Sequence, residues 1–309
     1  MHVLLLGSAA GGGFPQWNCW CPSCRVARAD PSAAKPRTQS SAALSVDGRR
    51  WFLLNASPDV REQLRRLQTE VAPGTIRQTP IEGVLVTDAE IDHTLGLVLL
   101  REARFLSVYA TRAVHAILDR DSHVLPLMRA FGDVRVTNLA LNSPVPLCYR
   151  DGSPSGLSVE AFAVPAGPPR FASNDEQGHT VGFMLREAGT AVACAFVPGC
   201  GDLDAALLAR LAEAEAVFFD GTFWRDDELA VLGISERTAR ELDHLPIGGA
   251  DGSLERIATL PCRYRIYTHI NNTNPILLEH SPEREAVTRA GLIVGDDGLH
   301  LTLPHRTHV

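Results

Sequence analysis

The segment Asp88-Ala-Glu90-Ile-Asp92-His93 carries four potential metal ligands at spacings of two, two and one residues. It directly follows an apolar run, Gly83–Thr87, which predicts a buried strand. Side chains in a tight loop after a strand can converge on one point, and a divalent ion needs such convergence because its ligands must be held close together. Acidic loops are often merely solvated, so this segment alone leaves a metal site and a surface loop equally open.

Two more apolar runs end in side chains that can bind a metal ion. His269 follows the run Arg265–Thr268, and Asp220 follows the run Ala216–Phe219. Three strand ends that each offer ligands favour one shared metal site over a solvated loop.

Among the residues at these strand ends, Asp92, His93 and His269 form one set of candidate ligands. Two imidazoles and one carboxylate suit non-haem Fe(II), because they leave coordination positions open for dioxygen and a substrate, and Zn2+ is the alternative ion. Glu90 is expected to orient a ligand or a bound water from beside the metal. Asp220 is open to two roles, as a further ligand or as a catalytic base.

A second group of ligands is the C-x-C-x-x-C cluster formed by Cys19, Cys21 and Cys24. Three thiolates at this spacing can face one tetrahedral ion, which predicts a structural Zn2+ rather than packed or merely reactive thiols. No nearby cysteine or histidine supplies a fourth ligand, so it must come from far along the chain. The other cysteines lie in isolated apolar settings that are typical of a core.

Composition excludes several classes of function. The chain has 309 residues, 45% of them hydrophobic, and a net charge of −7 without a basic stripe, so neither nucleic acid nor a membrane surface is an expected partner. The run Val3–Leu6 is too short to target or span a membrane. Seven cysteines, three of them crowded together, indicate reduced thiols and a cytoplasmic protein.

The elements that must position these ligands alternate between strand and helix. Further strand signals are Val3–Leu6, Ala42–Val46, Trp51–Asn55, Ser158–Val164, Val181–Arg186 and Ala191–Val197. Helix signals begin near Ser57-Pro58-Asp59 and cover Leu95–Leu100 and Leu203–Ala214. This alternation predicts an α/β protein with sheet layers covered by helices, in a single domain over residues 1–309. The stretch Asn142–Gly156, rich in proline, serine and glycine, is either a loop between two halves or an ordinary surface connection.

The segment Thr87–His93 resembles the H-x-H-x-D-H signature of the metallo-β-lactamase superfamily. Asp92 and His93 match its final pair, whereas Asp88 and Glu90 stand where two histidines hold the first metal. The resemblance implies an αββα sandwich, in which two mixed sheets are flanked by helices. The segment also departs from the ligand set of a dizinc hydrolase, because it lacks these two histidines.

The same resemblance implies roles for single residues elsewhere in the chain. His269 is similar to the last metal histidine, and His244 to a residue near the metal that shuttles protons, with a structural histidine as the alternative. His179 and Cys200 are weaker candidates for the middle ligands. Asn272 matches a histidine that completes the cysteine site in some members. The alternatives for that ligand are Asn274 and His280.

Longer strings resemble the coenzyme PQQ synthesis protein B family over nearly the full length. These strings are Gly11–Cys19, Asn55–Asp59, Asp220–Trp224 and His269–Pro275. The resemblance implies a role in pyrroloquinoline quinone (PQQ) biosynthesis, as an iron- and dioxygen-dependent hydroxylase of the tyrosine ring in a cross-linked glutamate–tyrosine intermediate. A carrier of PQQ and a zinc-dependent hydrolase are the alternatives.

The expected partners are therefore small molecules, either that intermediate or PQQ, and a homodimer is left open. Asn55 follows a strand end and is a candidate for contacts with polar groups of the substrate. Arg37 precedes a strand and is a candidate for pairing a substrate carboxylate, with a solvated loop charge as the alternative.

Overall fold

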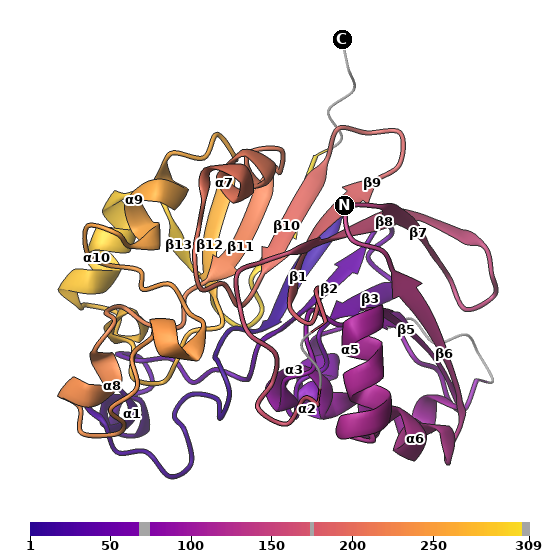
Figure 1. Ribbon diagram of the computed structural model, residues 1–309, viewed down its shortest axis with the longest axis horizontal. Coiled ribbons are helices and arrows are strands. Elements are labelled where there is room, and N and C mark those ends of the chain that lie inside the picture. Colours follow the sequence, from indigo (N-terminus) through magenta and orange to yellow (C-terminus); the bar gives the residue numbers. More distant parts are fainter. Residues whose placement is uncertain (68–74, 174–175, 305–309) are drawn as a thin grey trace.

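The computed structural model describes residues 1–67, 75–173 and 176–304. In these residues the strands form two seven-stranded mixed sheets (Figure 1). In spatial order, the first sheet contains β14 (His300–Thr302), β1 (His2–Gly7), β2 (Ser41–Ser45), β3 (Trp51–Leu54), β4 (Ile81–Leu85), β5 (Phe105–Thr111) and β6 (Asp133–Leu139). The second contains β13 (Ile293–Val294), β12 (Tyr264–Thr268), β11 (Ala216–Asp220), β10 (Ala193–Val197), β9 (Val181–Glu187), β8 (Pro154–Ala163) and β7 (Pro144–Cys148).

Each sheet is antiparallel at one end and parallel at the other. In the first sheet β1, β2 and β3 pair antiparallel, and β3 to β6 pair parallel. In the second sheet β7 to β10 pair antiparallel, and β10 to β13 pair parallel. The parallel strands β4, β11 and β12 are those whose ends carry the expected metal ligands.

Helices cover the outer faces of both sheets. They are α1 (Pro22–Ala29), α2 (Val60–Gln63), α3 (Ile91–Thr94), α4 (Gly96–Leu99), α5 (Arg112–Ala116), α6 (Val124–Arg129), α7 (Ala205–Leu211), α8 (Glu228–Val231), α9 (Ser253–Ala258) and α10 (Pro282–Arg289). Figure 1 shows α5 and α6 outside the first sheet and α9 and α10 outside the second. Among the described residues, none of these helices has the length and apolar character needed to cross a bilayer.

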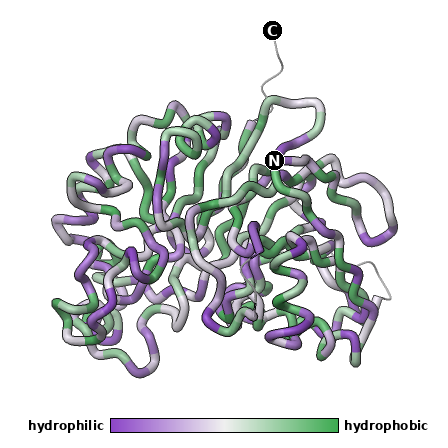
Figure 2. Tube along the Cα trace, in the orientation of Figure 1, coloured by the Kyte–Doolittle hydropathy of each residue, from purple (hydrophilic) through white to green (hydrophobic). Residues whose placement is uncertain are grey.

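The alternation of side chains between the two faces of each strand explains why the sheets stack. In β10 and β11, Phe196 and Phe218 point into the core between the two sheets, whereas Val197 and Phe219 point to the core under the outer helices. Successive strand residues face opposite sides of a sheet, so both faces of these strands are apolar. Each such buried side chain contributes about 1.5–3 kcal/mol of transfer free energy. Hydrophobic residues accordingly concentrate along the central strands (Figure 2).

The predicted αββα sandwich is confirmed, and the strands expected over Ala42–Val46 and Trp51–Asn55 are β2 and β3, which pair antiparallel. The helix expected over Leu203–Ala214 is shorter, because Asp204 caps it and α7 ends at Leu211. The interpretation of Asn142–Gly156 needs a correction, because this stretch contains β7. Pro144 and Pro146 are tolerated there because β7 is an edge strand that pairs only with β8 in the described sheet.

Candidate metal centre

The structure brings Asp92, His93 and His269 together between the two sheets. Asp92 and His93 lie on α3, shortly after β4 of the first sheet, and His269 directly follows β12 of the second. The nearest side-chain atoms, His269 Nε2 and Asp92 Oδ2, are 3.2 Å apart, and His93 Nε2 lies 3.9 Å from the same oxygen. One ligand atom from each residue lies within 4.8 Å of the others, which is the convergence that the sequence predicts.

One buried nitrogen in this group lacks a hydrogen-bond partner. His93 is 3% exposed, and no described residue contacts its Nε2 within hydrogen-bond geometry. A buried polar atom left unsatisfied costs about 1–3 kcal/mol. An ion bound between His93, Asp92 and His269 would satisfy this nitrogen, so the residues fit a divalent metal.

Asp88 orients His93 instead of extending the ligand set. Both oxygens of Asp88 lie 2.8 Å from His93 Nδ1, and Thr87 Oγ1 donates to Asp88 Oδ2 at 2.8 Å. Burial lowers the pKa of His93, but the carboxylates of Asp88 and Asp92 outweigh it and raise this pKa to about 9. Burial opposes ionisation of Asp92 as well, yet the two histidines hold its pKa below the usual range.

Asn55 holds Thr87 in place beside Asp88 and does not line the site. Its side chain is 0% exposed, and it donates to Thr87 Oγ1 and accepts from the backbone N–H of Thr87, both at 2.9 Å. Asn55 therefore links the ends of β3 and β4 and fixes Thr87, which in turn holds Asp88. The structure thus assigns Asn55 a structural role in place of the expected contact with substrate, because its side-chain amide already bonds to Thr87.

Thr222, which sequence analysis did not single out, organises the opposite side of the centre. Its Oγ1 donates to Asp220 Oδ1 at 2.6 Å and lies 2.9 Å from Nδ1 of His269. The hydroxyl also lies 3.1 Å from Nδ1 of His244. The only sequence signal for this role is the position of Thr222 two residues after the end of β11.

Asp220 and His244 form a buried pair beside the three expected ligands. Asp220 Oδ2 lies 2.7 Å from His244 Nδ1 and accepts from the backbone N–H of Cys200 at 2.9 Å. Although burial alone would raise the pKa of Asp220, the His244 imidazole lowers it, and Asp220 in turn raises the pKa of His244 against the effect of burial. These bonds support a role of Asp220 in orienting His244. The metal-ligand role stays a prediction, since atoms of Asp220, His244 and His269 also lie within 4.8 Å of one another.

The cysteine cluster and Asn272 meet in space as expected. The thiols of Cys19, Cys21 and Cys24 lie within 4.8 Å of one another at the start of α1. The side-chain amide of Asn272 is 3.1 Å from Cys19 Sγ and 3.4 Å from Cys24 Sγ. Asn274 turns away and donates to the backbone of Gly221. The side-chain N–H groups of Asn272 donate to these thiols, and the thiols offer three of the four ligands of a tetrahedral zinc ion.

A cavity of about 560 Å³ opens over the metal ligands. Its lining includes Glu90, an exposed residue, together with Phe223 and His244. Burial, followed by the charges of Asp88 and Asp92, raises the pKa of Glu90 to about 7. Glu90 can therefore accept or release a proton near neutral pH, as a general acid or base must.

Three other expected residues lie outside this lining. Arg37 is 4% exposed and forms an ion pair with Asp296, because it ties neighbouring loops together instead of facing solvent. Cys200 is 0% exposed, its Sγ donates to the backbone of Asp202 at 2.8 Å, and burial raises the pKa of its thiol. His179 lies 3.4 Å from the hydroxyl of its neighbour Thr180, which does line the cavity.

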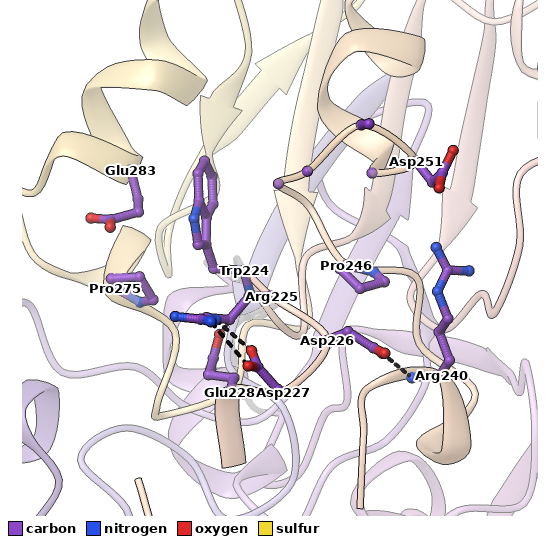
Figure 3. A pocket seen from close by; sticks show the side chains of 14 residues that line it. Trp224, Arg225, Asp226, Asp227, Glu228, Arg240, Pro246, Asp251, Pro275 and Glu283 are labelled. Atoms are coloured by element: carbon purple, nitrogen blue, oxygen red, sulfur yellow. Dashed lines mark hydrogen bonds and ion pairs between the residues drawn. The ribbon is translucent and has the colours of Figure 1, made fainter. Parts of the chain in front are cut away.

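Two further cavities lie nearby. One of about 490 Å³ is lined by carboxylates and arginines, with Arg240 and Asp251 at one side and Glu283 at the other (Figure 3). All three groups of metal-ligand atoms found in the described residues lie elsewhere. A larger apolar cavity of about 990 Å³ runs from the cysteine cluster and shares Phe223 and Leu242 with the metal cavity.

Comparisons with known proteins agree with this geometry. Residues 50–270 match the family model of the beta-lactamase superfamily domain. The chain is 41% identical to the coenzyme PQQ synthesis protein B of Gluconacetobacter diazotrophicus, over 98% of this chain and 99% of that protein. It is 40% identical to the same protein of Methylobacterium radiotolerans, over 98% and 100%.

Among solved structures, the chain is similar to Zn2+-bound PqqB from Methylobacterium extorquens, with 40% identity, a TM-score of 0.88 and coverage of 98% of this chain and 100% of that one. It also shares its fold with a diphosphatase of the PhnP family, at 19% identity and a TM-score of 0.66, with coverage of 97% and 96%.

Proposed function

The chain belongs to the coenzyme PQQ synthesis protein B family of the metallo-β-lactamase superfamily, and from this premise we propose that it is an iron- and dioxygen-dependent hydroxylase of PQQ biosynthesis. Its substrate is a cross-linked glutamate–tyrosine intermediate, and the tyrosine ring gains an oxygen atom. A reductant supplies the two electrons that balance the second oxygen atom, which leaves as water.

The observation that supports this function is that Asp88 contacts His93 and does not extend the ligand set. In the superfamily signature two histidines at the positions of Asp88 and Glu90 hold a first metal, but here both Asp88 oxygens contact His93 Nδ1. What remains is one carboxylate and two imidazoles, from Asp92, His93 and His269. This ligand set is typical of oxygen-activating iron enzymes and less typical of dizinc hydrolases.

A bound Fe(II) would supply dioxygen activation at this set of ligands. The chain itself supplies proton transfer, since His244 has its Nδ1 held by Asp220 at 2.7 Å and its Nε2 left to exchange a proton with a substrate hydroxyl. Glu90, with its pKa near 7, is a second group that can take up a proton in the cavity.

The experiment is a single-turnover reaction of the anaerobic, Fe(II)-loaded protein with a cross-linked glutamate–tyrosine compound, a reductant and ¹⁸O₂. We expect a ring hydroxyl that carries one labelled oxygen, and loss of both iron and product in Asp92→Ala. Asp226→Ala, an acidic residue of the separate cavity in Figure 3, is the matched control and should retain both. A product without label from dioxygen would refute the oxygenase function.

A zinc-dependent hydrolase is the second candidate. It is supported by the second group of potential ligands, Asp220, His244 and His269, which shares one histidine with the first group. Two tightly bound zinc ions at this centre together with phosphodiesterase turnover would favour it. A carrier of PQQ would instead bind PQQ stoichiometrically and keep its function in His93→Ala.

A further inference from the structure

Two arginines line the metal cavity. Apart from the three imidazoles, Arg170 and Arg237 are the basic side chains of this lining in the part of the chain that the structure describes. Other arginines such as Arg186 and Arg210 form ion pairs of 2.6 and 2.7 Å. The positive charge of Arg170 acts on Glu90, where it partly offsets the increase in the pKa of that carboxyl, and Arg237 donates to the backbone oxygen of Glu241.

The segments that carry these arginines meet at the cavity. A Cβ placed on Gly167, three residues before Arg170, would lie 3.0 Å from Asp243 Oδ2. Asp243 and Arg237 both lie in the connection between α8 and α9, and both line the cavity. Two guanidinium groups from different segments are thus presented to one space beside the metal ligands.

The carboxylates of the lining indicate why two cations lie at this cavity. Asp88, Glu90, Asp92 and Asp243 also line the cavity, so it would repel an anionic molecule if the arginines were absent. A guanidinium retains several N–H donors in a fixed planar fork that matches a carboxylate, even when one donor is already used. A guanidinium of this kind at the mouth of an acidic cavity is therefore suited to bind a carboxylate of the ligand.

We propose that Arg170 and Arg237 bind carboxylate groups of the substrate and thereby select a small molecule with at least two carboxylates. A cavity of about 560 Å³ accommodates such a molecule, with its carboxylates at the arginines and its ring toward Asp92, His93 and His269. The identity of the substrate rests on the proposed function, but the recognition of carboxylates does not require turnover.

The test measures binding of PQQ, a tricarboxylate, and of its trimethyl ester to the metal-loaded protein by calorimetry. We expect Arg170→Gln and Arg237→Gln each to weaken PQQ binding about tenfold or more, the loss of one charge-assisted pair, and to change binding of the ester by less than threefold. Metal content should stay at the wild-type value in both variants, which shows that the fold and the metal centre are intact.

Arg240→Gln is the matched control, because it removes the same charge from the same connection, at an exposed residue that lines the separate cavity in Figure 3. It should leave PQQ binding unchanged. Equal losses for PQQ and its ester, an equal loss in Arg240→Gln, or no binding of PQQ to the wild type would overturn the proposal. Since no product is formed in this measurement, failure of the hydroxylase function would appear only in the labelling experiment.

Discussion

At the scale of single residues, the three histidines of the centre are oriented in the same way. Each has its Nδ1 beside a fixed oxygen, from Asp88 for His93, from Asp220 for His244 and from Thr222 for His269. The oxygen fixes the orientation of the ring and leaves Nε2 for a metal or a substrate. Such supporting partners commonly change metal affinity by about 10–100-fold when they are removed.

Asp88→Asn tests this arrangement, because an amide cannot present two acceptor oxygens to His93 Nδ1. We expect Fe(II) affinity, measured by competition with a chelator, to fall about 10–100-fold while the fold is retained. Asp226→Asn makes the same change outside the centre and should keep the wild-type affinity. If Asp88→Asn binds iron as tightly as the wild type, Asp88 does not support His93.

Glu228 makes the stability of the protein depend on pH. It is 4% exposed, and burial raises its pKa from 4.5 to about 7, although hydrogen bonds from Thr273 and Trp224 oppose this increase. Between these two values the folded state holds a proton that the unfolded state releases, so this contribution to stability is present below about pH 4.5 and is lost as pH rises to about 7. A tenfold difference in proton affinity between the two states corresponds to about 1.4 kcal/mol.

Glu228→Gln should therefore gain stability relative to the wild type as pH rises from 5 to 8, measured by urea unfolding at constant metal concentration. Glu236→Gln removes an exposed carboxylate of the next segment and should follow the wild type at both pH values. A constant difference between Glu228→Gln and the wild type would contradict a raised pKa.

At the scale of elements, one loop joins the two metal-binding groups. His269 directly follows β12, and Asn272, three residues later, lies against the thiols of Cys19 and Cys24. The backbone of His269 is left-handed, with φ at 54°, a conformation that non-glycine residues adopt only when their surroundings enforce it. The same loop is tied to the cysteine cluster through Asn272.

Cys24→Ser should remove one zinc per chain and also weaken metal binding at Asp92, His93 and His269, since the loop after β12 loses its anchor. Elemental analysis measures the zinc, and chelator competition measures the second effect. Cys148→Ser changes a thiol that lies outside the cluster and should alter neither. Loss of zinc with an unchanged active-site affinity would show that the two groups are independent.

The sequence predicts the elements that carry ligands better than the contacts between them. The acidic segment after β4 and His269 after β12 are recognisable because ligand residues interrupt apolar runs. The elements over residues 101–139, which form the edge of the first sheet, carry no ligand signal and were not predicted. The roles of Asp88 and Thr222 depend on which side chains meet across the two sheets, and spacing along the chain does not contain that information.

At the scale of the whole molecule, a metal at this centre would bind both sheets at once. Asp92 and His93 follow β4 of the first sheet, and His269 follows β12 of the second. A ligand that binds only the folded state stabilises it by about 2.7 kcal/mol at a concentration 100 times its dissociation constant. The ion should therefore act as a link between the two layers.

Addition of Fe(II) under anaerobic conditions to protein stripped of its active-site metal should raise the melting temperature measured by calorimetry. We expect no rise in Asp92→Ala and a normal rise in Asp226→Ala. An equal rise in Asp92→Ala would mean that the added metal acts at another site.

The distance along the chain between the two halves of the centre affects when it can form. Asp92 and His269 are separated by 177 residues. A ribosome that adds about 5–20 residues per second takes on the order of ten seconds or longer to synthesise that interval. Until β12 has emerged and packed, Asp92 and His93 lack their third partner and hold an ion only weakly. We therefore expect the metal to be selected after the second sheet has folded, and not by a nascent chain that lacks His269.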